Sequence, residues 1–181
     1  MIEELRDLLG EGKVSAMAEV LKEHGCDRWN FSHLPEVVVF AESREDVVAV
    51  MKFAYARDIP VTTRGAGVGY VGGCVPLHGG IALSVARMNR ITELAPGDGV
   101  VVTEPGVITG DLQDAVRELG WYYPPDPASL RECSIGGNLA TNAGGIQVVR
   151  HGNARDLCLG VEAVLPDGTI YSDLSPLRKN N

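Results

Sequence analysis

The sequence predicts an α+β fold in which α-β units and antiparallel hairpins share one domain. Hydrophobic residues recur at helical spacing next to short apolar runs, a pattern typical of β-α-β units. Two hairpins are indicated, one over residues 91–104 around Pro96-Gly97-Asp98-Gly99 and one over 161–171 around Pro166-Asp167-Gly168. Such hairpins disfavour a doubly wound parallel sheet. The length of 181 residues fits a single domain.

The composition excludes several classes of protein. Hydrophobic residues make up 45% of the chain and charged residues 22%, which is the profile of a soluble globular protein. Lys and Arg number 16 against 24 Asp and Glu, a net charge of −8, so we expect no nucleic-acid partner. The sequence shows neither a secretory signal nor a run of about 20 apolar residues that could form a transmembrane segment. We therefore expect a cytoplasmic protein.

The first half of the chain reads as two packing helices followed by a β-α-β unit. Apolar stripes over residues 2–9 and 17–24 each end at a glycine and predict short helices. Residues 37–40 form a continuous apolar run typical of a buried strand. The motif Ser43-x-x-Asp46 resembles a capping box and predicts that a helix begins there. Residues 59–63 return as a strand.

The second half adds a strand, a helix and a long irregular segment. Residues 81–85 predict a short strand, and Thr109 is expected to cap a helix that ends before Gly120. Residues 121–156 are rich in Pro, Gly and Asn and show little periodicity, so we expect a long loop. Ordered loops of this length inside a compact domain are usually functional.

The cysteines and histidines do not form a recognisable site in the sequence. The four cysteines are far apart and lack metal-ligand spacing, so we expect reduced thiols with neither a disulfide framework nor a zinc site. Cys133 is interpreted as a packing or exposed thiol. The histidines are expected to be surface or capping residues, because none has a carboxylate or hydroxyl at a spacing that suggests a catalytic triad. These residues are Cys26, Cys74, Cys133, Cys158, His24, His33, His78 and His151.

Glycine is concentrated in one loop, where seven of the sixteen positions from 65 to 80 are Gly. Gly67-x-Gly69-x-x-Gly72 matches the dinucleotide fingerprint formally, but that fingerprint requires a helix to begin at the loop, and none is predicted here. Glycines allow close approach and positive φ, so successive N–H groups can converge on an anion such as a pyrophosphate. The alternative is a set of tight turns without a ligand.

A second glycine-rich segment has similar chemistry. Residues 134–138 and 141–145 add hydroxyl and amide groups that can bond a phosphate, a ribose or a flavin edge. Two such segments could hold one extended dinucleotide from both sides. Tight turns remain the alternative here too.

Four blocks of sequence, in this order, resemble the FAD-binding domain of vanillyl-alcohol-oxidase (PCMH-type) flavoproteins: residues 60–69, 85–91, 123–129 and 134–145. Within that superfamily the chain is most similar to FAD-linked D-2-hydroxy-acid dehydrogenases, namely the glycolate oxidase flavin subunit, D-lactate dehydrogenases and D-2-hydroxyglutarate dehydrogenase. The resemblance implies two small α/β subdomains with the FAD between them. We expect an N-terminal helical segment over 1–33 and the FAD-binding domain over 34–181.

The resemblance also implies which residues contact FAD. The backbone of residues 64–69 would hold the pyrophosphate, the second segment would line the flavin and ribityl part, and residues 161 and 164 would lie near the adenine. The implied residues are Arg64, Gly65, Ala66, Gly67, Val68, Gly69, Gly73, Pro125, Ala128, Ser134, Ile135, Gly136, Gly137, Asn138, Thr141, Ala143, Gly144, Val161 and Val164. The Arg64 side chain could pair with phosphate or brace the loop against a carboxylate.

Position 68 departs from the family pattern. Relatives usually carry Thr or Ser there, and members with covalently attached flavin carry His, whereas this chain has Val68. One hydroxyl bond to FAD is therefore expected to be missing. Because valine cannot form the covalent link, we expect non-covalent FAD.

The reaction implied by the resemblance is oxidation of a D-2-hydroxy acid to the 2-oxo acid, with possible electron-acceptor subunits as partners. In the family the groups that bind substrate belong to a cap domain, for which this chain has no counterpart. We therefore expect a C-terminally truncated chain that is inactive alone and has no catalytic residues or metal ligands of its own. The alternative is a non-catalytic nucleotide-binding or interaction module.

Overall fold

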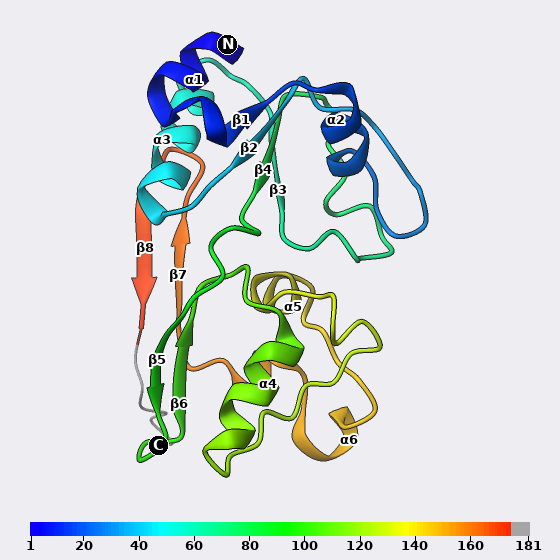
Figure 1. Cartoon of the computed structure of the whole chain (residues 1–181), viewed down its shortest axis with the longest axis vertical. Coiled ribbons are helices and arrows are strands. Elements are labelled where there is room, and N and C mark those ends of the chain that lie inside the picture. Colours follow the sequence, from blue (N-terminus) through cyan, green and yellow to red (C-terminus); the bar gives the residue numbers. More distant parts are fainter. Residues whose placement is uncertain (175–181) are drawn as a thin grey trace. The chain divides into compact units, whose positions relative to one another are not determined.

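The computed structural model describes residues 1–174, so residues 175–181 of the predicted domain lie outside the described part. The chain divides into two compact units (Figure 1). Of the described residues, the first comprises Met1–Arg87 with Ala163–Tyr171, and the second comprises Met88–Glu162 with residues 172–174. Both units contain helices and strands, which confirms the mixed α/β character expected from the sequence.

A four-stranded sheet of order β1-β2-β4-β3 forms the centre of the first unit. Strands β2 (Val37–Phe40) and β3 (Val61–Arg64) both run parallel to β4 (Ile81–Ser84), which lies between them. The short edge strand β1 (Val14–Ser15) pairs with β2 in antiparallel fashion. The predicted β-α-β unit is thus confirmed, with β4 inserted between its two strands.

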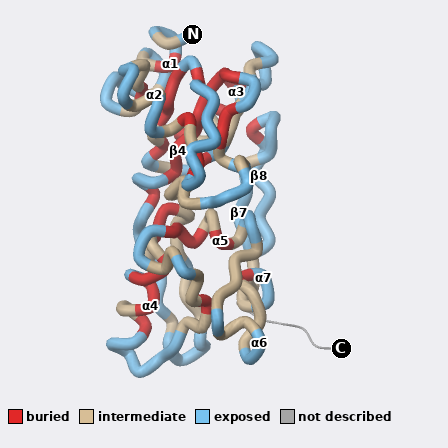
Figure 2. Tube along the Cα trace, turned by 90° about the vertical axis from the view of Figure 1, so that its right-hand side faces the viewer, coloured by how far each residue is buried: buried red, intermediate tan, exposed pale blue. Residues whose placement is uncertain are grey.

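Strands β2 and β4 form the core of this unit. In the register of the sheet, Ile81 is the partner of Val37 on one side and of Val61 on the other. Val37, Val38, Val39 and Ile81 are fully buried, and Figure 2 shows buried residues along this part of the chain. Central parallel strands are covered on both faces, which is why they read as continuous apolar runs in the sequence.

Three helices accompany the sheet: α1 (Ile2–Leu9), α2 (Ala18–His24) and α3 (Arg44–Tyr55). In Figure 1, α1 and α3 lie to the left of these strands and α2 lies to their right. Helix α1 contacts α3 and β1, and α2 contacts β2. A short 3-10 helix, η1 (Glu11–Lys13), joins α1 to β1.

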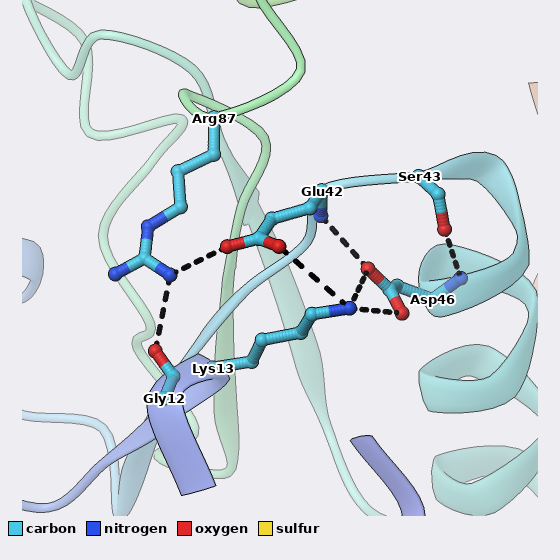
Figure 3. A network of polar contacts seen from close by, with 6 residues as sticks. All are labelled: Gly12, Lys13, Glu42, Ser43, Asp46 and Arg87. Atoms are coloured by element: carbon cyan, nitrogen blue, oxygen red, sulfur yellow. Dashed lines mark hydrogen bonds and ion pairs between the residues drawn. The ribbon is translucent and has the colours of Figure 1, made fainter. Parts of the chain in front are cut away.

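Helix α3 begins as the sequence predicts, and a polar network surrounds its first turn (Figure 3). The Ser43 hydroxyl accepts a hydrogen bond from the Asp46 N–H at 3.2 Å. The Asp46 carboxylate accepts two bonds from Lys13 Nζ, at 2.9 and 2.8 Å, and one from the Glu42 N–H. Burial opposes ionisation of Asp46, but these donors outweigh it and lower the pKa of the carboxyl. The network joins Lys13, in the predicted N-terminal segment 1–33, to the β-α-β unit. The division into a segment 1–33 and a domain 34–181 stays a prediction.

The second unit contains a hairpin and a helix, as expected. Strands β5 (Ile91–Ala95) and β6 (Val100–Thr103) pair antiparallel, and α4 (Thr109–Glu118) follows. Residues of α4 and of the segments beside it form a small core: Val107, Leu112, Val116 and Ile135. A further hairpin of β7 (Val161–Val164) and β8 (Ile170–Asp173), whose residues 163–171 belong to the first unit, confirms the second predicted hairpin.

Two local predictions in this unit are wrong. Thr109 does not cap α4, because the N-cap is Ile108 and the Thr109 hydroxyl instead donates to the Cys133 carbonyl at 3.2 Å. The predicted loop 121–156 contains three short helices: α5 (Ile135–Thr141), α6 (Val148–His151) and α7 (Ala154–Leu157). Of the helices in residues 1–174, none has the length and apolar character needed to cross a bilayer.

Candidate functional site

The first glycine-rich loop leaves β3 at Arg64 and reaches β4 without forming a helix, so the absence of a Rossmann-type helix is confirmed. Gly67 and Gly72 have φ values of +72° and +73°, which glycine adopts without steric cost. Within residues 1–174, the N–H groups of residues 66–69 donate no hydrogen bond to the protein. Because these half-buried or exposed donors lack protein partners, they are available to an anion.

The Arg64 side chain supports this loop from the protein side. It is only 8% exposed and donates to the carbonyls of Cys26 at 2.6 Å and Glu23 at 3.1 Å. A third bond reaches Cys74 Sγ at 3.3 Å. The acceptors are two carbonyls and a thiol, so Arg64 does not brace the loop against a carboxylate, and its pairing with a phosphate stays a prediction. A Cβ at Gly67 would overlap the Arg64 guanidinium, so the loop backbone lies directly against this group.

Arg64 makes no direct ion pair with a residue in the described part of the chain, and the buried Asp27 carboxylate is the negative group on the same loop. The unpaired N–H groups at residues 66–69 are therefore the feature that favours a negatively charged ligand at this loop.

Asp27 contacts the other end of the loop, although its sequence context does not predict this contact. Its carboxylate is 5% exposed; Oδ1 accepts from the N–H groups of Trp29 and Phe31, and Oδ2 accepts from the Gly72 N–H at 3.1 Å. The signal was present in part, because an aspartate in a polar stretch commonly bonds the N–H two residues on. Its contact with Gly72, 45 positions away, had no local signal.

The second glycine-rich segment forms the start of α5 rather than an open loop. The N–H groups of Ile135 and Gly136 donate to the carbonyls of Val107 and Pro105, both at 2.8 Å. These two donors are therefore used within the protein. The Ser134 hydroxyl, by contrast, belongs to a residue only 2% exposed and has no hydrogen-bond partner among the described residues. An unpartnered buried hydroxyl is uncommon and indicates a missing partner.

Two other polar side chains of this segment serve the protein itself. The Asn138 amide donates to the Thr109 hydroxyl at 2.6 Å, and the Thr141 hydroxyl donates to the Gly137 carbonyl at 2.9 Å. The buried Cys133 thiol also donates to Thr109. This confirms Cys133 as a packing thiol and shows how Thr109 fixes the start of α5 against α4.

The remaining predicted residues are placed as follows. Gly73 has open space around its Cβ position, Pro125 is buried and its carbonyl accepts from Gln113, and Ala128 is exposed. Ala143 donates its N–H to the Asn138 carbonyl, Gly144 lies against the Asn153 side chain, and Val161 and Val164 lie in β7. The structure thus brings residues 64–73 together in the first unit and residues 125–144 in the second.

The titratable groups near the second segment show no catalytic arrangement among the described residues. Burial raises the pKa of Tyr123 to about 12, so its phenol stays protonated at neutral pH. Burial lowers the pKa of His24 in the first unit, whose Nδ1 lies 3.1 Å from the Val20 carbonyl. Residues 1–174 contain no cluster of His, Cys, Asp or Glu suited to a metal ion, and the four cysteines are free thiols.

Comparison with known families and proteins agrees with this chemistry. The model of the FAD binding domain family matches residues 35–173. The chain is 36% identical over 182 residues to a D-2-hydroxyglutarate dehydrogenase of Stutzerimonas stutzeri, covering 99% of this chain and 39% of that protein. It is 43% identical over 136 residues to a D-lactate dehydrogenase of Anaerostipes hadrus, covering 75% of this chain and 28% of the relative.

Solved structures share the fold. A 4-ethylphenol oxidase from Gulosibacter chungangensis superposes with a TM-score of 0.80 at 29% identity, over 94% of this chain and 34% of that one. An alkyldihydroxyacetonephosphate synthase gives a TM-score of 0.86 at 20% identity, over 96% of this chain and 37% of the other. The chain therefore spans about two fifths or less of the length of the proteins it matches.

Proposed function

This chain belongs to the FAD-binding domain family, and we propose on that premise that it is the FAD-binding portion of a flavin-dependent enzyme that oxidises a D-2-hydroxy acid to the 2-oxo acid. The observation that carries the cofactor assignment is the set of unpaired N–H groups at residues 66–69 beside the buried Arg64 charge. A diphosphate is the part of FAD that such a group of donors fits.

The residues present fit the rest of FAD as well. The unpartnered Ser134 hydroxyl is a free donor and acceptor in the second unit, where the flavin and ribityl part is assigned. FAD supplies the redox chemistry when bound, while the chain's own groups bind and orient it. Val68 has no nucleophilic atom, and the Cys133 thiol is buried against Thr109, so the proposed binding is non-covalent.

Titration of the 181-residue chain with FAD, ADP and riboflavin tests the cofactor assignment. ADP carries the diphosphate and lacks the flavin, whereas riboflavin carries the ring and lacks phosphate. We expect ADP to compete with FAD and riboflavin to bind poorly, because the proposed site at residues 66–69 recognises the anion. Equal binding of riboflavin and FAD, with no binding of ADP, would refute the assignment.

The substrate class rests on the relatives, whose names refer to D-2-hydroxyglutarate, D-lactate and glycolate. Its test uses the full-length protein with bound FAD, mixed anaerobically with each of these three acids. We expect at least one of them to bleach the visible flavin absorption. No bleaching by any 2-hydroxy acid, despite bound FAD, would exclude this class. Electron-acceptor subunits and a cytoplasmic location stay predictions.

A second candidate is that the 181-residue chain by itself binds the nucleotide without turnover. It is favoured by the unpaired N–H groups of residues 66–69, which can bind the diphosphate of a nucleotide without any catalytic step. Substrate-dependent dye reduction by the purified chain, supplied with FAD, would contradict it.

A further inference from the structure

The loop at residues 65–73 is held by a short turn that precedes it in the chain by about 40 positions. Residues 27–31 form this turn: the Asn30 N–H donates to the Asp27 carbonyl at 3.2 Å, and the Asp27 N–H donates to the Phe31 carbonyl at 3.0 Å. Asp27 Oδ1 closes it further by accepting from two N–H groups of the same turn. Four hydrogen bonds within residues 27–31 therefore define the turn without a contribution from the loop.

Two bonds connect this turn to the far end of the loop. Asp27 Oδ2 accepts the Gly72 N–H, and the Arg28 N–H donates to the Gly69 carbonyl at 3.1 Å. The second bond has an electrostatic consequence. A carbonyl oxygen that pointed toward a bound anion would repel it. The bond from the Arg28 N–H holds the Gly69 carbonyl oxygen toward the turn instead. Between these anchors, Tyr70 and Val71 are exposed.

The near end of the loop is connected to the same segment. Arg64, which lies against Gly67, donates to the carbonyl of Cys26, the residue directly before Asp27. Residues 26–28 therefore contact the loop on both sides of the free N–H groups at residues 66–69. Preorganised donors bind an anion more tightly than donors that must first be ordered.

We propose that Asp27 is a positioning residue of the diphosphate site: its carboxylate fixes the turn with one oxygen and Gly72 with the other, and so holds the loop in its anion-binding conformation. The inference rests on the proposed binding of FAD. Asp27 itself needs no contact with the cofactor. The role requires a carboxylate, because one acceptor oxygen must serve the N–H groups of the turn and the other the N–H group of Gly72.

The first test is Asp27→Asn, which keeps one acceptor oxygen but places an NH₂ group against the Gly72 or turn N–H groups. The matched control is Asp46→Asn, since Asp46 is also a buried residue of the first unit, 9% exposed, whose carboxylate accepts a backbone N–H bond, from Glu42, and makes no bond to the loop. We expect Asp27→Asn to bind ADP and FAD at least about tenfold more weakly under conditions where it is folded, and Asp46→Asn to bind both like the parent. ADP binding at parent affinity by Asp27→Asn, or equal weakening in both variants, would overturn the proposal.

A second pair of variants tests the same anchor without changing Asp27. Arg28 occupies the second position of the turn, where proline is well tolerated. Arg28→Pro removes the N–H that bonds Gly69, while Arg28→Ala removes the side chain and keeps that N–H. The proposal requires weaker ADP binding by Arg28→Pro than by Arg28→Ala, and equal affinities would count against it.

Hydrogen exchange separates this inference from the proposed function. If the parent chain binds neither ADP nor FAD, the proposed function fails, but the positioning role can still be measured. Asp27→Asn should then speed amide exchange in peptides covering residues 65–73, and Asp46→Asn should leave it unchanged. Unchanged exchange in Asp27→Asn would show that Asp27 does not hold the loop.

Discussion

Among the glycines of residues 65–73, Gly67 is the one for which the structure predicts the largest effect of substitution by alanine. Two costs add. An alanine held at φ +72° is strained by about 1–2 kcal/mol. Its Cβ would also displace the Arg64 guanidinium, and losing at least one of that group's hydrogen bonds costs a further ~1.5–3 kcal/mol. We therefore expect the free energy of unfolding to fall by about 2.5–5 kcal/mol.

Urea unfolding followed by circular dichroism measures this change, and ADP titration of the folded variant measures its consequence for the site. Two companions locate the effect, because Gly69 and Gly12 have no atom within 4 Å of their Cβ positions and no positive φ. Gly12→Ala should keep both stability and ADP affinity. Gly69→Ala should keep stability but weaken ADP binding, since its methyl group would occupy the proposed diphosphate space. Parent-like stability of Gly67→Ala would refute the packing argument, and parent-like ADP affinity of Gly69→Ala would refute the ligand position.

Three further predictions concern single groups. Ser134→Ala removes a hydroxyl without a protein partner, so urea unfolding should show no loss of stability, while fluorescence titration should show FAD affinity reduced about 2–10-fold, the value of one net hydrogen bond. Thr109→Val leaves the Asn138 amide without its acceptor and should lower the free energy of unfolding by about 1–3 kcal/mol in the same urea assay. The pKa of Asp46 is lower in the folded state than in the unfolded chain, so the ionised carboxylate stabilises the fold. This stability is complete above the ordinary carboxyl pKa of about 4 and is lost as the pH falls through the lower folded-state pKa. The urea midpoint of Asp46→Asn should therefore decline less over that acidic range than the midpoint of the parent.

The β-α-β unit was predictable because its determinants are local. A continuous apolar run predicts β2, and Ser43 predicts the start of α3 through a bond that spans only three positions. The antiparallel hairpins were predictable for the same reason, since their turn residues lie between the strands they join.

The errors arose where distant groups decided the local structure. Thr109 has the residue type of a cap, but its hydroxyl bonds Cys133, 24 positions away. Gly136 and Gly137 each disfavour a helix by about 1 kcal/mol. Helix α5 forms nevertheless, because the carbonyls of Pro105 and Val107 accept its first N–H groups. Asp27 was missed for a related reason: its contact with Gly72 depends on the fold.

The two glycine-rich segments look alike in the sequence but offer a cofactor different groups. In the first, the N–H groups of residues 66–69 are unpaired, while two side chains that contact the loop, Arg64 and Asp27, are occupied by the protein. In the second, two N–H groups at the start of α5 are occupied and the Ser134 side chain is unpaired. Backbone N–H groups suit a phosphate, which only accepts, whereas a hydroxyl both donates and accepts and so suits a flavin edge or a ribityl chain. The first segment thus offers donors suited to a diphosphate, and the second offers a hydroxyl suited to a flavin edge or a ribityl chain.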